Sequence, residues 1–223
     1  GDPAIRQGHY KDMEAFWTDL TAAYRKEVQE LIAAGVKYIQ FDDTCIAFLC
    51  DEAHRATVRN WGRDPDELLQ DYCRRMNTIV AGLPSDVTIT LHQCRGNREG
   101  NWAAEGGYDA VADALFNQIN VNGYFLEWDS ARAGGFEPLR LLPKSGKVVV
   151  LGLVSSKSAE LESVDALAAR VDQAAKFAPL DQLAISPQCG FASSVGGNPM
   201  TEAQEEKKLA LVVEAARKVW GGA

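Results

Sequence analysis

One short segment combines a β-branched, apolar run with two residue types that bind metal ions. Thr88-Ile-Thr-Leu91 is followed by His92, Gln93 and Cys94, and then by a polar turn that contains Gly96. Residues two apart in an extended strand point to the same side, so His92 and Cys94 would present an imidazole nitrogen and a thiolate to one point. This pair of donors suits zinc. The segment supplies half of a metal site, and other segments must supply the rest.

Two more candidate ligands follow other predicted strands. Glu127 ends a strand predicted at 123–126, and Cys189 follows one at 182–185. One nitrogen, two sulfurs and one carboxylate would form a tetrahedral zinc site. The alternative is two buried thiols, a core histidine and a carboxylate in an ion pair. Two thiolates and a carboxylate would leave the zinc site net anionic, which suits holding a substrate thiol as thiolate rather than activating water.

The elements that must position these residues alternate between strand and helix. The hydrophobic pattern predicts strands at 36–41, 87–91, 123–126, 147–151 and 182–185. It predicts helices at 11–34, 65–82, 108–117, 158–177 and 201–220. This alternation favours an α/β fold with a parallel sheet, and the candidate ligands lie at the carboxyl ends of the strands, where barrels carry their active sites.

A (β/α)8 TIM barrel is preferred to a dinucleotide-binding fold, because no Gly-x-Gly-x-x-Gly or P-loop follows a strand. Five βα units are too few to close eight strands, and the chain opens on a helix. We therefore expect residues 1–223 to be the C-terminal part of a single barrel, with roughly the N-terminal third to two-fifths of a typical barrel absent.

The amino-acid composition limits which partners the protein could bind and in which cellular compartment it is expected. The formal charge of −8 argues against nucleic acid or an anionic membrane as a partner, and no apolar run is long enough to span a membrane. Five cysteines, an odd number spread along the chain, favour reduced thiols in a cytoplasmic protein. Of these, Cys45, Cys50 and Cys73 are expected to be small core residues, and His54 is expected to be solvated.

Four segments together resemble a known family. They are Tyr38-Ile-Gln-Phe-Asp42-Asp43, His92-Gln-Cys94-Arg-Gly-Asn97, Phe125-Leu-Glu127 and Ser186-Pro-Gln-Cys189-Gly190. In this order they resemble the C-terminal catalytic barrel of cobalamin-independent methionine synthase, and especially its shorter bacterial homocysteine methyltransferase-like relatives. The resemblance extends through nearly all of the chain.

The resemblance implies a metal, a reaction and site residues. His92, Cys94, Glu127 and Cys189 would hold Zn2+ as cofactor. Asp42 would bind the amino group of homocysteine; its alternative roles are a helix N-cap or a partner for a nearby arginine. The implied reaction moves a methyl group from 5-methyltetrahydrofolate, in its polyglutamate form, to the zinc-bound thiolate of homocysteine, which gives methionine.

Two departures from the family affect this interpretation. The family has a histidine, thought to transfer a proton to the departing folate, just past the strand that ends here at Leu151-Gly152. This chain instead has Lys157 nearby, which could serve as the cation or acid or could be a surface charge at the start of a helix. The family's first barrel segments, which contact homocysteine and folate, are also absent. The chain is therefore expected to need the N-terminal part of its own barrel, and a homodimer is also allowed.

Further polar residues follow the same strands. Arg95 and Asn97 could orient ligands or bind an anionic group, and Trp102 could stack on a pterin or pack its loop down. Asp129 and Arg132 resemble a supporting pair beside Glu127. Two other functions stay open: zinc-dependent alkyl transfer to another thiol, as in coenzyme M transferases, and a non-catalytic zinc- or thiol-binding homologue.

Overall fold

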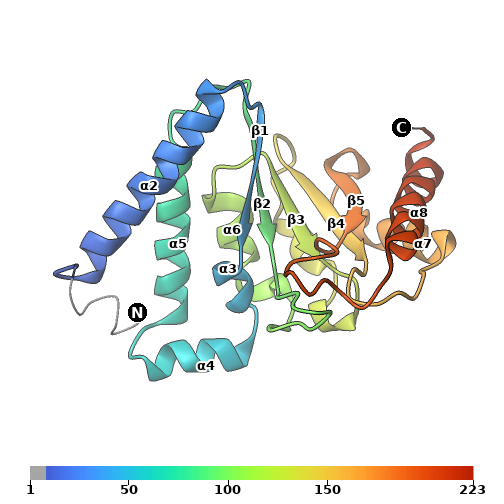
Figure 1. Ribbon diagram of the computed structural model, residues 1–223, viewed down its shortest axis with the longest axis horizontal. Helices are drawn as coiled ribbons and strands as arrows, with labels where there is room; N and C mark the ends of the chain where they lie inside the picture. Colours follow the sequence, from blue (N-terminus) through green and yellow to red (C-terminus); the bar gives the residue numbers. More distant parts are fainter. Residues whose placement is uncertain (1–8, 223) are drawn as a thin grey trace.

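A computed structural model describes residues 9–222 and contains one sheet of five parallel strands in chain order (Figure 1). The strands are β1 (Tyr38–Asp43), β2 (Thr88–Gln93), β3 (Gly123–Glu127), β4 (Val148–Val154) and β5 (Leu183–Pro187). All five predicted strands are present, with ends shifted by at most three residues. The predicted α/β fold with a parallel sheet is therefore confirmed.

The helices lie around this sheet as in one wall of a barrel. They are α2 (Met13–Ala33), α3 (Cys45–Phe48), α4 (Glu52–Asn60), α5 (Pro65–Val80), α6 (Ala112–Gln118), α7 (Val164–Ala174) and α8 (Glu202–Trp220). Short 3-10 helices are η1 (Tyr108–Ala110), η2 (Ala131–Ala133), η3 (Glu137–Leu141) and η4 (Leu180–Gln182). Crossovers between parallel strands are right-handed, so a strand order that never reverses keeps the connecting helices on one face.

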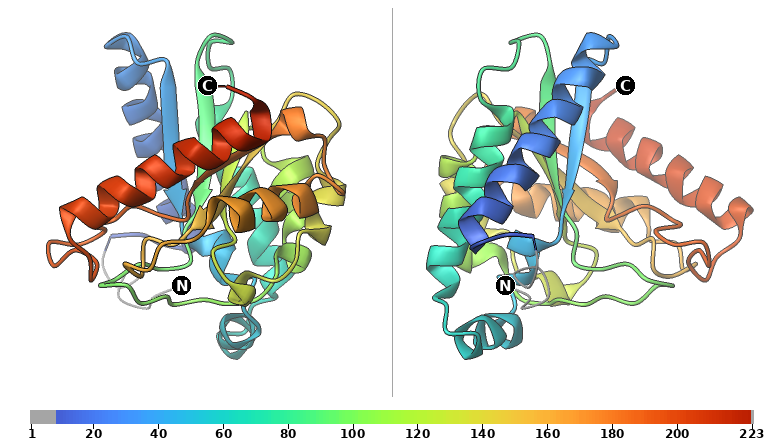
Figure 2. Two further views of the ribbon diagram at one scale, coloured as in Figure 1. Left: turned by 90° about the vertical axis from the view of Figure 1, so that its right-hand side faces the viewer. Right: turned by 60° about the vertical axis from the view of Figure 1, so that its left-hand side comes forward.

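Local sequence signals explain where the long helices begin. The Asp12 carboxylate accepts a hydrogen bond from Ala15 N at the start of α2, and Asp64 caps α5, which opens on Pro65. Such caps satisfy amide groups that the first turn leaves free, and proline suits that turn because its missing N–H is not needed there. Helix α2 packs against α5, and α7 packs against α8 (Figures 1 and 2).

The core lies between the sheet and its helices. Alternate strand residues such as Leu91, Tyr124 and Leu151 are completely buried there. The residues between them, such as Gln40, His92 and Phe125, therefore point to the opposite face, which is the inner face of a barrel. The core accordingly holds the sheet in place while the inner face stays available for chemistry.

The segment between β1 and α5, for which the hydrophobic pattern predicts no helix, forms α3 and α4. Asp43 accepts hydrogen bonds from Cys45 N and Ile46 N at the start of α3. Asp51 likewise caps α4, in which Val58 alone is buried. Because the helix presents a single buried apolar residue, it lacks the periodic stripe that would have predicted it. The expectation for Cys45 was wrong, since this thiol is exposed, whereas Cys50 and Cys73 are buried.

Helix α7 begins at Val164, six residues later than predicted. Ser163 caps it by accepting a hydrogen bond from Ala166 N. The preceding residues run without regular structure, and the Glu162 side chain accepts a hydrogen bond from Ser155 N at the end of β4. The segment predicted as the first turns of the helix is therefore used to hold a loop at the carboxyl edge of the sheet.

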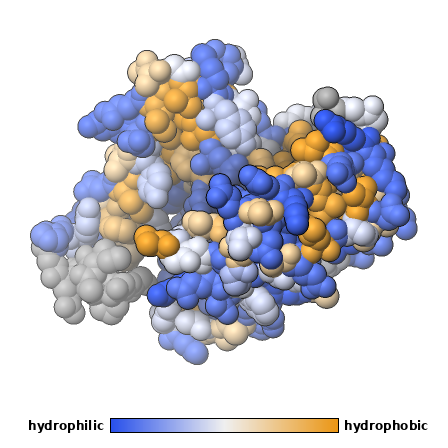
Figure 3. All heavy atoms as spheres, turned by 45° about the vertical axis from the view of Figure 1, so that its right-hand side comes forward, coloured by the Kyte–Doolittle hydropathy of each residue, from blue (hydrophilic) through white to orange (hydrophobic). Residues whose placement is uncertain are grey.

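The surface mixes hydrophilic residues with apolar patches (Figure 3). Large apolar side chains that are exposed include Tyr24 and Tyr38 near β1 and Leu209 and Val213 on α8. Strands β1 and β5 are the two edges of the sheet within residues 9–222. None of the helices in this described part is long and apolar enough to cross a membrane.

Candidate metal centre

The four candidate ligands meet at the carboxyl edge of the sheet. His92 lies near the end of β2 and Cys94 just beyond it, Glu127 is the last residue of β3, and Cys189 follows β5 by two residues. One ligand atom from each residue lies within 4.8 Å of all the others, and the sulfur atoms of Cys94 and Cys189 are 4.0 Å apart. Parallel strands thus bring together residues that are up to 97 positions apart.

The hydrogen bonding of the cluster, as well as its residue types, fits a zinc ion. His92 Nε2 and Glu127 Oε2 are buried, and neither has a hydrogen-bond partner among the described residues. Leaving such atoms unpaired costs free energy, and a cation between them would satisfy both. With two sulfurs beside them, the donors match in number and softness what zinc binds in proteins.

The two thiols influence one another strongly. A hydrogen bond from Cys94 lowers the pKa of Cys189, and it raises the pKa of Cys94, which supplies the proton. Two like charges this close repel each other, so the first thiol ionises readily and the second does so with difficulty. Burial by itself would lower the pKa of His92, but the Cys189 thiolate and nearby carboxylates raise it overall. The raised pKa favours a protonated His92 facing the Cys189 thiolate.

Glu127 is fully buried and held from one side. Its Oε1 accepts a hydrogen bond of 2.9 Å from Arg95 N. Its other oxygen, Oε2, lies 3.5 Å from Lys157 Nζ and 3.7 Å from the Arg132 guanidinium. Burial raises the pKa of Glu127, and the Lys157 cation opposes that rise. One oxygen is thus fixed, while the other faces the cluster with cations nearby.

Arg95 holds Glu127 through its backbone N–H, and its side chain packs into the protein interior. Its side chain is completely buried, the guanidinium lies 4.3 Å over the ring of Tyr108, and it donates to the carbonyl of Gly106. The Tyr108 hydroxyl accepts a hydrogen bond of 2.9 Å from Glu127 N. The contact that orients Glu127 is made by the backbone of Arg95, and the two roles considered for its side chain stay predictions. Sequence reasoning missed this role of Tyr108, the first residue of the helix predicted at 108–117, because hydrophobic periodicity does not show which backbone group a tyrosine hydroxyl contacts.

Asn97 holds the turn that carries Cys189. Its Nδ2 donates to Gly190 O at 2.7 Å and to Ser193 Oγ at 3.1 Å, while its Oδ1 accepts from Asn198 Nδ2 at 3.0 Å. Asn198 in turn donates to Ser156 O. Three loops at the carboxyl edge are therefore fastened to one another through a buried amide pair.

Asp42 lies at the mouth of a cavity of about 550 Å³ on the inner face of the sheet. Gln40, His92, Ser186 and Cys189 also line this space. The Asp42 carboxylate is 3.9 Å from His92 Nε2 and its side chain is 67% exposed. Helix α3 is capped by Asp43, so the N-cap role considered for Asp42 belongs to its neighbour. Asp42 keeps a carboxylate free beside the cluster.

Lys157 is buried beside the cluster, whereas Trp102 lies at the surface. Lys157 is buried, so the surface-charge interpretation was wrong. Trp102 is 54% exposed and packs against the guanidinium of Arg132, 4.9 Å from the ring centre, which agrees with a role in packing its loop. His54 is not simply solvated, because its Nε2 lies 2.8 Å from Ala103 O in the same loop.

Comparison with known proteins links the whole chain to one family. The sequence model for the "Cobalamin-independent synthase, Catalytic domain" matches residues 4–218. The uncharacterized protein YxjG of Bacillus subtilis is 45% identical over 217 residues, which cover 97% of this chain and 57% of YxjG. A methionine synthase of Pyrococcus abyssi is 26% identical over 82% of this chain and 45% of its own length. The chain thus spans about half the length of these relatives.

Solved structures have the same fold. A candidate vitamin-B12 independent methionine synthase from Listeria monocytogenes is similar with a TM-score of 0.69 and 34% identity, over 95% of this chain and 57% of that one. A B12-independent methionine synthase from Shewanella sp. W3-18-1, in complex with selenomethionine, has a TM-score of 0.70 at 24% identity, over 96% and 57% of the two chains. At that identity the second likeness concerns the fold alone.

Proposed function

Because this chain belongs to the cobalamin-independent methionine synthase family, whose catalytic domain matches residues 4–218, we propose a function in methyl transfer. In this proposal the chain takes part in zinc-dependent transfer of a methyl group to the thiol of homocysteine, which gives methionine. The proposed donor is 5-methyltetrahydrofolate in its polyglutamate form. The observation that carries this proposal is the buried cluster of His92, Cys94, Glu127 and Cys189, whose ligand atoms lie within 4.8 Å of one another.

The proposed roles follow from the donor set. His92, Cys94, Glu127 and Cys189 would hold the metal, with Arg95 and Asn97 orienting the ligands. A zinc ion bound there would lower the pKa of a substrate thiol and keep it as a nucleophilic thiolate. The sulfur then forms a bond to the methyl carbon, the bond from carbon to the donor nitrogen breaks, and that nitrogen takes up a proton.

Two charged residues are proposed to act on the substrates. The Asp42 carboxylate borders the 550 Å³ cavity next to His92, and there it would bind the ammonium group of homocysteine. Lys157 is buried beside Glu127, and it would supply positive charge near the site where the family has a histidine. Burial of Lys157 and its 3.5 Å distance from Glu127 support a role for this lysine in the centre.

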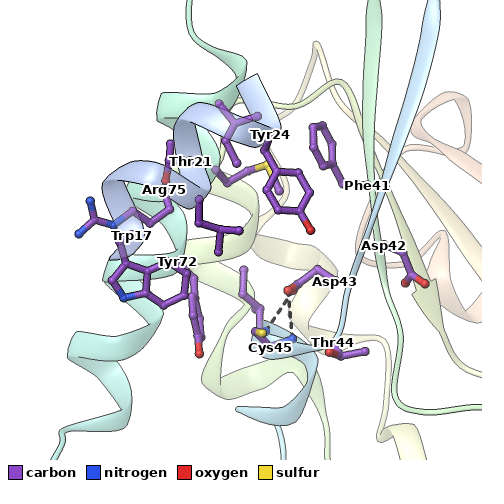
Figure 4. Close-up of a pocket in the computed structure, with 14 residues that line it drawn as sticks. Trp17, Thr21, Tyr24, Phe41, Asp42, Asp43, Thr44, Cys45, Tyr72 and Arg75 are labelled. Carbon is purple, nitrogen blue, oxygen red and sulfur yellow. Dashed lines mark hydrogen bonds between the residues drawn. The ribbon is translucent and has the colours of Figure 1, made fainter. Parts of the chain in front are cut away.

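We also propose that residues 1–223 are the C-terminal part of one barrel. At the β1 edge lies a cavity of about 320 Å³, whose wall includes Trp17, Tyr24, Phe41 and Tyr72 (Figure 4). Its aromatic lining next to an edge strand suits side chains of a preceding strand and helix. The relatives, which are almost twice as long, would supply such segments.

The decisive experiment measures zinc and methyl transfer on the same purified full-length protein. Cys94→Ser and Cys189→Ser should each lose most of the bound zinc and of the methionine formed from homocysteine and methyltetrahydrofolate, because serine is a poor ligand for this metal. Cys45→Ser is the matched control, since this exposed thiol lies outside the cluster. Full zinc content and full transfer activity in either ligand variant would overturn the proposal.

Because Lys157 stands near the position where the family has a histidine, the same experiment should also compare different substrates. The unsubstituted protein should be assayed with several pairs of thiol and methyl donor, because the group that differs from the family lies 3.5 Å from a candidate ligand. Transfer with another pair but not with homocysteine and folate would favour the related alkyltransferases. Binding of zinc and homocysteine without turnover by any pair would favour a non-catalytic homologue.

A further inference from the structure

A chain of buried polar groups leads from the candidate metal centre to the C-terminal helix. Arg132 donates to Asp129 Oδ1 at 2.7 Å, and Ser155 Oγ donates to Asp129 Oδ2 at 2.9 Å. Ser155 N donates to Glu162 Oε1 at 2.7 Å, and Lys208 Nζ of α8 is 3.0 Å from Glu162 Oε2. The chain thus joins η2, the end of β4, the segment before α7 and helix α8.

The charges in and beside this chain are balanced, and all but Glu162, whose side chain is 23% exposed, are removed from water. Its cations are Arg132, Lys157 and Lys208, and its anions are Glu127, Asp129 and Glu162. The side chain of Lys208 is completely buried, and that of Asp129 is 4% exposed. Buried ions are tolerated when each has a partner of opposite charge and good hydrogen bonds, so the arrangement depends on every member.

Arg132 has two carboxylates within reach but makes a hydrogen bond to one of them. Its guanidinium lies 2.7 Å from Asp129 Oδ1 and 3.7 Å from Glu127 Oε2. Lys157 Nζ lies 3.5 Å from the same oxygen, and in the described part of the chain neither cation makes a hydrogen bond to Glu127 Oε2. A shift of about 1 Å, the difference between an ion pair and a direct hydrogen bond, would let the guanidinium occupy this candidate ligand atom.

We propose that the Asp129–Ser155–Glu162–Lys208 chain holds Arg132 away from Glu127 and so keeps Glu127 Oε2 available to the metal. Ser155 and Lys208 are then positioning residues, which act through Asp129 and Arg132. The inference rests on the proposed zinc site and adds a role for α8, which contributes no ligand. If the Ser155 hydroxyl is lost, Asp129 Oδ2 loses its donor and Arg132 can turn toward Glu127.

The test is the zinc dissociation constant of the purified full-length protein, measured by competition with a chelator of known affinity. Ser155→Ala should weaken zinc binding about tenfold, the lower end of what loss of an outer partner usually costs a metal site. Ser158→Ala is the matched control in the same loop, because its exposed hydroxyl serves only its own turn. Ser155→Thr keeps a hydroxyl and should restore most of the affinity.

The same measurement on Lys208→Met tests whether the effect reaches α8. It should weaken zinc binding at least threefold, whereas Lys218→Met on the same helix, which removes a half-exposed ion pair, should not. A purely structural role would lower the thermal unfolding midpoint of the metal-free protein without changing zinc affinity. A loss of less than threefold in Ser155→Ala overturns the inference, and the same result in Lys208→Met alone overturns its extension to α8.

Failure of the proposed function gives a different result. If the unsubstituted protein binds no zinc, or if Cys94→Ser binds it as well as the unsubstituted protein does, the metal centre itself is wrong. If zinc binding depends on Cys94 but not on Ser155, the centre stands and only the positioning chain is rejected.

Discussion

At the scale of single residues, the candidate centre depends on which atoms are left without partners. Glu127 has one oxygen bound to Arg95 N and the other free, and the Nε2 atom of His92 is buried and unpaired among residues 9–222. The Asn97 amide and one nitrogen of the Arg95 guanidinium are instead occupied by hydrogen bonds to loops. Arg95 Nη2 and Lys157 Nζ are also buried without a partner among the described residues, but they are cationic donors, whereas His92 Nε2 and Glu127 Oε2 can offer a lone pair to a metal.

Asp42 can be tested separately from the metal. Asp42→Asn should raise the KM for homocysteine about tenfold or more, because a hydrogen bond to a charged group contributes roughly 1.5–3 kcal/mol. The zinc content should stay unchanged, since Asp42 is not one of the four clustered ligands. Steady-state kinetics with metal analysis would check this, with Asp86→Asn, in an exposed ion pair with Lys37, as control. An unchanged KM would remove Asp42 from the substrate site.

At the scale of elements, the loop between β2 and η1 is held by backbone contacts with η2 and with the segment after α3. Gly106 N donates to Arg132 O, and a Cβ added to Gly106 would lie 2.3 Å from Cys50 O. The residue also has a φ of +108°, which favours glycine. Close backbone contact at this point sets the path of the loop that carries Arg95.

Gly106→Ala should therefore destabilise the protein by on the order of 3 kcal/mol, because strain at a special backbone position is combined with a clash. Gly82→Ala is the matched control, since Gly82 has a φ of +67° with nothing near its missing Cβ. It should cost only about 1 kcal/mol, the usual penalty for the left-handed conformation. Equal losses in denaturant unfolding of the two variants would contradict the role of the Cys50 contact.

Lys147, just before β4, holds the end of α6. Its Nζ donates to Phe116 O at 2.7 Å and to Ile119 O at 2.6 Å. Burial lowers the pKa of Lys147 to about 8. Between this value and the ordinary lysine pKa of roughly 10.4, the unfolded chain binds more protons than the folded one.

The free energy of unfolding should consequently rise with pH between about 8 and 10 through this group. Below pH 8 the lysine is charged in both states and its contribution is constant. Lys147→Met should remove this part of the slope, as measured by denaturant unfolding at several pH values. Identical slopes in the two proteins would show that the carbonyl groups around Nζ compensate for burial of its charge.

At the scale of the whole molecule, the sheet has two edges in the described part of the chain. Thr88 N donates to Lys37 O and Cys94 N donates to Asp43 O, so alternate residues of β1 face β2. The backbone groups of Tyr38, Gln40 and Asp42 face the other way. An edge of this kind is a template for another strand, in agreement with the proposal that the chain is part of a longer barrel.

In the full-length protein, the amides of Tyr38, Gln40 and Asp42 should therefore exchange with solvent as slowly as those of the central strand β3. A neighbouring strand would protect them. Hydrogen exchange resolved by residue would measure this, with the exposed Glu99 in the loop after β2 as the fast reference. Fast exchange at the β1 edge with slow exchange in β3 would show that no strand pairs there.

The sequence alone determined the alternation of strands and helices and the types of the four clustered residues. Hydrophobic periodicity reports which face of an element is buried, and the carboxyl ends of parallel strands share one edge, so His92, Cys94, Glu127 and Cys189 were expected to meet. It could not reveal α4, because one buried valine leaves no periodic stripe.

Only the tertiary structure decided which charges surround that cluster. Burial of Lys157, the hydrogen bond from Glu127 N to Tyr108 and the contact between Lys208 and Glu162 depend on the paths of loops between distant segments. Those paths follow from packing of the whole chain, and residue spacing does not encode them. The ligand types were thus readable from local sequence, whereas the groups that position them were set by long-range contacts.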